Sequence, residues 1–175
     1  MSHWTLSVRV LHWITAGALA IQLIVVFGLQ GPGSAMFIWM PWHITLGFSL
    51  LALAALRVGA RALPPRRLAS SSGIATAMHV ALYLVLILTV LTGWFAYRPA
   101  ALMPTPLVFG VIPLRPIHLP FAVPWIAWHQ ALVWILITLV IGHGVAAAYH
   151  FLVLRDRVLQ RMLRSDRASK RDPSD

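Results

Sequence analysis

The sequence contains no cysteine and no glutamate, and its four acidic residues are all aspartates near the C-terminus. Without cysteine, the chain has neither disulfides nor thiolate ligands for a metal. The aspartates are Asp156, Asp166, Asp172 and Asp175, so residues 1–155 carry no carboxylate side chain. Over that part of the chain, a carboxylate proton relay, a carboxylate acid–base pair and a hard-metal site are therefore excluded.

Charge of either sign is also missing from three long stretches of the chain. No charged residue lies between Arg9 and Arg57, between Arg67 and Arg98, or between Arg115 and Arg155. Each stretch contains at least one run longer than the roughly 20 apolar residues that cross the hydrocarbon of a bilayer. The composition agrees, with 59% hydrophobic residues, 10% charged residues and a mean hydropathy of +0.80. We therefore expect a polytopic membrane protein.

The apolar runs predict four spanning helices, over about residues 11–29, 36–58, 75–97 and 124–154. Helices are favoured over a membrane β-barrel because the runs are continuous rather than alternating. The first run is too long for a cleaved signal peptide. The predicted fold is an all-α, four-transmembrane-helix bundle over residues 1–160, followed by a basic and disordered cytoplasmic tail over residues 161–175. The proline-rich connection over residues 98–124 is expected to form a lid on the outer membrane surface.

The basic residues predict the orientation of this bundle. If the N-terminus is inside, all of them lie on the inner side except Arg98 and Arg115. The positive-inside rule then places both termini in the cytoplasm. The net charge of +10 is assigned to topology and to anionic headgroups rather than to nucleic-acid binding.

Histidine is the residue type that the predicted spans offer for chemistry. Six of the eight histidines lie in these helices or at their ends: His12, His43, His79, His129, His143 and His150. Neutral imidazole is a good ligand for iron, copper and zinc. With no acid to pair with, six such residues indicate cofactor binding more than local hydrogen bonding. His3 and His118 lie in polar or loop segments, and no role is assigned to them.

The depths of the histidines sort them into two levels. His129 and His143 are fourteen residues apart, close to four turns, so they face one side of their helix about 21 Å apart. His43 lies at the outer level with His129, and His12 lies at the inner level with His143. Two levels with two imidazoles each suit two bis-histidine haems, both of b type because no cysteine can attach them covalently. His79 has the same depth as His12, so spacing alone lets either residue pair with His143.

Glycines occur beside these histidines and would leave room for a porphyrin against a helix. They are Gly17, Gly47, Gly142 and Gly144. Close helix packing also uses glycine, so each one alone indicates little.

Four segments carry a resemblance to a known family: VLHWI, WHITLGFSLLALAALRVGAR, MHVALYLVL and WHQALVWILITLVIGHGVAAAYHF. Over about residues 5–160 the chain resembles the bacterial cytochrome b561 family, which comprises four-helix, di-haem, quinone-reactive inner-membrane proteins. The resemblance implies that His12 and His143 hold the haem on the cytoplasmic side, and that His43 and His129 hold the haem on the periplasmic side. The chain is most similar to members that oxidise superoxide outside and reduce ubiquinone.

The two ends of the bundle offer residues for such a reaction. Arg98 and Arg115, with no acid nearby, would attract anionic superoxide to the outer face, although they could equally anchor the loop. At the inner end His150, with His79 and Tyr149, is expected to hydrogen-bond a quinone carbonyl or to relay its protons.

Three other functions fit the same sequence. The chain could be the cytochrome b subunit of a dehydrogenase or hydrogenase that exchanges electrons with a protein partner. It could pass electrons from quinol to a soluble periplasmic redox carrier. It could also be a histidine-lined transporter for a soft metal, without haem.

Overall fold

The computed structural model describes residues 6–29, 34–62, 73–98, 107–117 and 123–155. Most of them form four long helices, α1 (Leu6–Ile24), α2 (Ser34–Ala62), α3 (Gly73–Ala96) and α4 (Trp125–Leu152), and a π-helical segment η1 (Val25–Leu29) continues α1. All four are long and apolar enough to cross a membrane. The prediction of an all-α fold with four spanning helices is confirmed. The predicted helix ends differ from the observed ones by about five residues at most.

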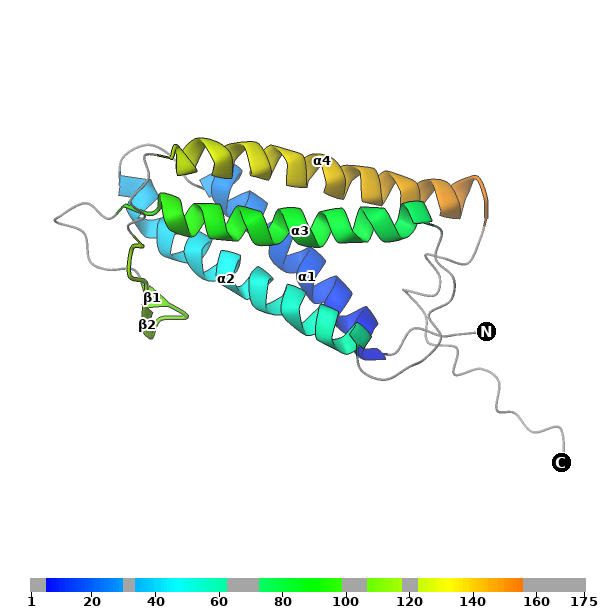
Figure 1. Cartoon of the computed structure of the whole chain (residues 1–175), viewed down its shortest axis with the longest axis horizontal. Coiled ribbons are helices and arrows are strands. Elements are labelled where there is room, and N and C mark those ends of the chain that lie inside the picture. The colour runs from blue at the N-terminus through cyan, green and yellow to red at the C-terminus, as the bar shows by residue number, and fades with distance from the viewer. Residues whose placement is uncertain (1–5, 30–33, 63–72, 99–106, 118–122, 156–175) are drawn as a thin grey trace, which may run out of the picture.

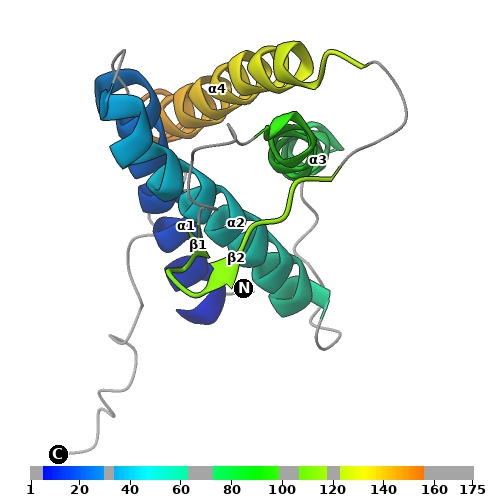
Figure 2. The same cartoon turned by 90° about the vertical axis from the view of Figure 1, so that its left-hand side faces the viewer.

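The helices pack as two pairs. Helix α3 lies along α4, and α1 lies along α2, which also contacts α3. In Figure 1, α3 and α4 run side by side, while α1 and α2 cross beneath them at an angle; Figure 2 shows the same crossing from the end where α4 begins. The first residues of α1 and the last residues of α4 lie at the same end of the bundle (Figure 1), as an even number of spans requires.

A small apolar core lies at the middle of the bundle. Its most buried members are Leu50, Ala54, Leu86 and Leu136, from α2, α3 and α4. Leu136 lies midway along α4 between His129 and His143, so this core separates the two levels of histidines. Large apolar side chains elsewhere point outward, including Trp134, which is 61% exposed, and Ile141, which is 60% exposed. A surface this apolar is typical of a protein whose solvent is lipid.

The connection between α3 and α4 contains a short hairpin. Strands β1 (Leu107–Val108) and β2 (Ile112–Pro113) pair antiparallel, and Gly110 in the turn has a φ of +73°, a value that glycine adopts without strain. The hairpin packs against α2 at the end of the bundle where α2 and α4 begin (Figure 1). Residues 99–106 and 118–122 of the predicted lid, the tail over residues 161–175, and His3 and His118 lie outside the described residues.

Candidate functional site

Histidines of α4 face histidines of α2 and α1 at two levels. At one level the rings of His129 and His43 have centroids 6.1 Å apart and planes at 86°. At the other level the rings of His143 and His12 have centroids 6.3 Å apart and planes at 71°. Among the described helices, the backbone of α4 approaches that of α3 closely, whereas it meets α1 and α2 mainly through side chains. The two ring pairs therefore bridge the space between α4 and the crossing pair of helices.

The separation of the rings is the one that axial ligation requires. Two imidazoles on opposite sides of one metal ion, with metal–nitrogen bonds of about 2 Å, have ring centroids roughly 6 Å apart. In the described part of the chain, no three histidine or acidic side chains come together as a metal site. The outer level thus offers two histidines, and at the inner level His143 can pair with His12 or with His79. Two such ligands are what the axial positions of a haem would need, whereas a protein-only zinc site needs three or four.

His129 is held in the tautomer that a metal ligand needs. Its Nδ1 lies 2.8 Å from the carbonyl oxygen of Thr89 on α3, and because a carbonyl only accepts, Nδ1 must donate. The lone pair of Nε2 is then free for a metal ion. A Cβ added at Gly93 would lie 2.9 Å from both Cε1 and Nδ1 of this ring, so the ring occupies space that only glycine leaves open.

His43 has a polar partner on α1. The Nε2 atom of Gln22 lies 2.6 Å from Nδ1 of His43 and 3.1 Å from the carbonyl oxygen of His43. Oε1 of Gln22 is buried without a hydrogen-bond partner. A half-turn of the amide would bring Oε1 opposite Nδ1, which could then donate and leave Nε2 to a metal ion, at the loss of the bond that Gln22 Nε2 donates to the His43 carbonyl. Gln22 is thus placed to orient His43 as the Thr89 carbonyl orients His129.

The inner pair has a charged neighbour. Nη2 of Arg57 lies 3.1 Å from Nδ1 of His12, and the guanidinium carbon lies 5.5 Å from the ring centre of Tyr83. A guanidinium only donates, so Nδ1 of His12 accepts in this contact and Nε2 carries the proton. A metal bound at Nε2 would require the proton on Nδ1 instead, so this hydrogen bond and metal ligation by His12 are alternatives.

His79 also lies at the inner level. Its ring centroid is 5.4 Å from that of His143, with the planes at 67°. This is shorter than the roughly 6 Å of two coaxial ligands, whereas the His12–His143 separation matches it. By this separation His12 fits better than His79 as the partner of His143, while the angles between the ring planes, 71° and 67°, do not distinguish the two.

The predicted glycines differ in their surroundings. A Cβ built at Gly17, Gly47 or Gly144 would meet nothing within 4 Å, whereas at Gly142 it would lie 3.9 Å from the Met78 side chain. The first three glycines therefore border open space, but Gly17 and Gly144 are exposed and Gly59 and Gly73 have equally open surroundings, so the openness does not by itself indicate a cofactor.

The candidate quinone residues lie beyond His143 on α4. Tyr149 and His150 have ring centroids 6.4 Å apart, and Tyr149 is 51% exposed. His150 follows His143 by two turns, or about 10 Å along the helix. His79 lies against His143 itself, so the structure places it beside the inner histidine pair, and Tyr149 and His150 beside each other further along α4.

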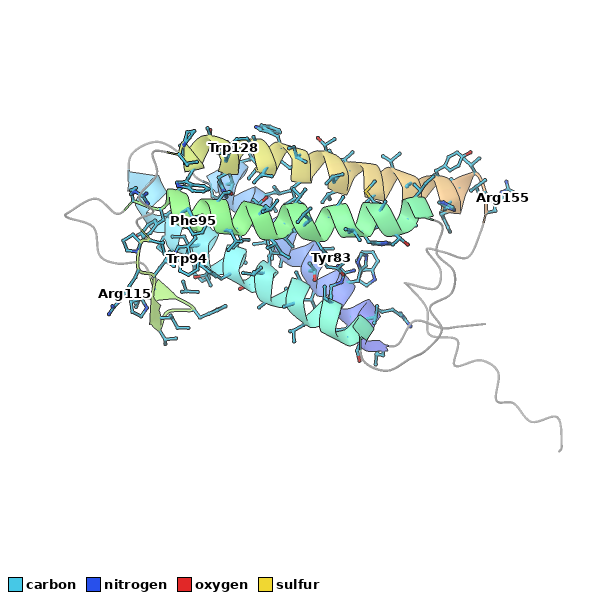
Figure 3. The ribbon with its side chains drawn as sticks, viewed as in Figure 1. Tyr83, Trp94, Phe95, Arg115, Trp128 and Arg155 are labelled. Atoms are coloured by element: carbon cyan, nitrogen blue, oxygen red, sulfur yellow. The ribbon has the colours of Figure 1, made fainter. Side chains whose placement is uncertain are left out.

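At the opposite end of the bundle, Arg98 and Arg115 are both exposed; Figure 3 shows Arg115 and Arg155 at the two ends. Nη1 of Arg98 donates to the carbonyls of Phe95 and Tyr97, where α3 ends, so this arginine caps the helix as well as carrying charge. Partial burial holds the pKa of the Tyr97 hydroxyl above its usual range. The hydroxyl therefore stays neutral and adds no negative charge near the arginines.

A further hollow lies outside the bundle. It is an apolar groove of about 560 Å³ between α2 and the hairpin, lined by residues that include Phe48, Trp94 and Leu114. No histidine lines this groove, so it is separate from both ring pairs.

Four spanning helices with facing histidines at two depths define a membrane-embedded haem cytochrome. The family model described as prokaryotic cytochrome b561 matches residues 3–165, and the chain belongs to this family. Comparisons with curated proteins and with solved structures gave no match. The protein is accordingly a multi-pass bacterial membrane cytochrome that transfers electrons through b-type haem.

Proposed function

We propose that this cytochrome binds two b-type haems and carries electrons from superoxide at the periplasmic face to ubiquinone at the cytoplasmic side of the inner membrane. The observation that carries the proposal is the presence of two histidine pairs, with ring centroids 6.1 Å and 6.3 Å apart, about four turns apart on α4. In the balanced reaction, two superoxide ions lose one electron each and leave as dioxygen. Ubiquinone takes up the two electrons and two protons to become ubiquinol.

The histidines define what the bound cofactors can do. His43 and His129 would hold the outer haem, and His12 and His143 the inner one; each haem supplies a one-electron carrier. If two histidines hold each haem, no coordination site would be left for dioxygen. This favours electron transfer at the haem edge over activation of a bound substrate.

The residues at the two ends have different tasks. Arg98 and Arg115 attract the anionic donor to the outer face, and the neutral Tyr97 does not oppose them. At the inner end, His150 and Tyr149 hydrogen-bond a quinone carbonyl and pass protons to it. Histidine is the natural proton carrier there, because no carboxylate occurs before Asp156.

Haem counting tests the proposal directly. Fully loaded wild-type protein should contain two haems per chain by pyridine haemochrome, and carbon monoxide should leave most of the reduced spectrum unchanged. His43→Ala or His129→Ala should remove one haem only, and superoxide should no longer reduce the haem that remains at the wild-type rate. A single haem in fully loaded wild type contradicts the proposal.

The electron donor is tested separately. Stopped-flow mixing with superoxide should reduce wild-type haem far faster than background. If reduction is slow and a dehydrogenase or hydrogenase subunit copurifies with the protein, the chain is instead the cytochrome b subunit of that complex.

A further inference from the structure

The two histidine pairs differ in the charge beside them. Arg57 follows His43 by fourteen residues on α2, so it lies on the same face four turns further in. At the inner level it occupies the place that His43 has at the outer level, with its guanidinium 3.1 Å from His12. The polar groups that contact the outer pair are the Gln22 amide and the Thr89 carbonyl, which are both neutral.

The charge of Arg57 is held in place by more than one contact. Its guanidinium lies over the Tyr83 ring at 5.5 Å, an attraction that does not depend on the tautomer of His12. The side chain is half-buried, so solvent screens its charge less than that of an exposed arginine. The arginines at the other end, Arg98 and Arg115, are exposed, so water and salt screen their fields.

A fixed positive charge changes the reduction equilibrium of a neighbouring redox centre. Reduction adds one negative charge, and a cation a few ångströms away in a medium of low dielectric stabilises the product more than the reactant. The effect is weaker where solvent surrounds the cation. Arg57 should therefore favour the reduced state at the His12–His143 level over the His43–His129 level.

We propose that Arg57 gives the inner haem the higher reduction potential and thereby sets the direction of electron flow from the outer pair to the inner pair. In this step one electron leaves the reduced outer centre and reduces the oxidised inner one; the donor at the outer face replaces it, and quinone removes it at the inner face. The inference rests on the proposed di-haem function, and it assigns the direction to one side chain.

Equilibrium redox potentiometry of the fully loaded full-length protein, followed optically, tests this. Arg57→Gln should lower the reduction equilibrium constant of one haem at least tenfold, which for a one-electron couple is 59 mV. The constant of the other haem should stay within threefold of its wild-type value. Arg57→Lys, which keeps the charge, should restore most of the loss. Arg155→Gln, which removes an exposed charge at the same end of the bundle, is the matched control and should change neither haem.

The inner haem is identified as the one that remains in His43→Ala, and the outer haem as the one that remains in His143→Ala. This inference is wrong if both haems bind but Arg57→Gln changes the reduction equilibrium constant of the inner haem by less than threefold. It is also wrong if Arg57→Lys lowers that constant as much as Arg57→Gln does. Neither result affects the di-haem proposal. If the Arg57→Gln protein does not retain the inner haem, the reduction potential of the inner haem in His43→Ala is compared with that of the outer haem in His143→Ala. An inner potential below the outer one overturns the inference. A wild type with a single haem would instead contradict the proposed function itself.

Discussion

At the scale of single residues, the histidines depend on neighbours that determine which ring nitrogen carries no proton and how much space surrounds the ring. Thr89 does this for His129 through its backbone carbonyl, and Gln22 can do it for His43 through its amide. Such partners hold the ring orientation of a metal-bound histidine, and their loss typically weakens metal binding 10- to 100-fold. The proposed outer site would accordingly depend on more residues than its two histidines.

Gly93→Ala should weaken the outer haem. The added methyl would lie 2.9 Å from two atoms of the His129 ring, so the ring must move away from its position. Overpacking of this kind costs about 1–3 kcal/mol, or a loss of affinity of roughly 5- to 150-fold. Haem content and spectra measured over a haem titration check this. Gly59→Ala is the control, because a Cβ there meets nothing within 4 Å, and equal haem content in the two variants would contradict the prediction.

The spacing of the histidines could be predicted from the sequence, but their partners could not. A fourteen-residue interval fixes two side chains on one face of any α-helix, whatever the rest of the fold does. Gln22, Thr89 and Gly93 lie on helices other than α4, so their contacts depend on how the helices cross. A glycine or glutamine inside an apolar run was the available signal. For Thr89 there was none, because it contributes a backbone carbonyl.

At the scale of the elements, the spans were predicted well and the details of their ends were not. Apolar length determines where a helix can cross a bilayer, so all four spans were found. Helix α1 begins at Leu6 rather than at about residue 11, because Arg9 is a good helix former and a charge near a helix end is tolerated by reaching the interface. The hairpin over residues 107–113 was not predicted; its strands are two residues each, too short for a periodic pattern.

Helix α4 is longer than the hydrocarbon requires, and its last turns carry Tyr149 and His150. At 28 residues it spans about 42 Å, against a hydrocarbon thickness of about 30 Å. His150→Ala should therefore retain both haems and their reduction from outside, but slow electron transfer to ubiquinone at least tenfold, a lower bound set below the usual contribution of proton transfer of roughly 100-fold or more. His79→Ala should have a similar but weaker effect. Stopped-flow reoxidation of the reduced protein by a ubiquinone analogue measures this.

The matched control for that experiment is Phe151→Leu, which alters the adjacent exposed position without removing a polar group. Loss of a haem from the His150→Ala protein would make His150 a ligand in place of His143 and would contradict the assignment of the inner site.

At the scale of the whole molecule, both ends of the described bundle carry arginines and no acidic side chain. Arg9 lies near the start of α1 and Arg155 follows α4, whereas Arg98 follows α3 and Arg115 follows the hairpin. Figure 3 labels Arg155 and Arg115 at the two ends of the bundle. No carboxylate occurs before Asp156, so no described segment presents a negative side chain to a superoxide ion. The electron donor is the part of the function that depends most on this field, and the fold alone does not determine it.

Removal of both outer charges should slow the reaction with superoxide. Two exposed charges steer weakly, so Arg98→Gln/Arg115→Gln should lower the association rate about 3- to 30-fold at low salt, near the bottom of the usual range for electrostatic steering. The difference should fade as the Debye length falls to about 8 Å or less. Haem content and reduction by dithionite should not change, since neither arginine contacts a histidine pair in the described structure. The measurement is haem reduction after mixing with superoxide over a salt series.

Arg155→Gln, at the opposite end, should behave as wild type. Because Arg98 also caps α3, the rate loss must depend on salt to count as steering; a loss that stays constant across the series would assign Arg98 to holding the loop. A wild-type rate that is near background and insensitive to salt would exclude superoxide as the donor.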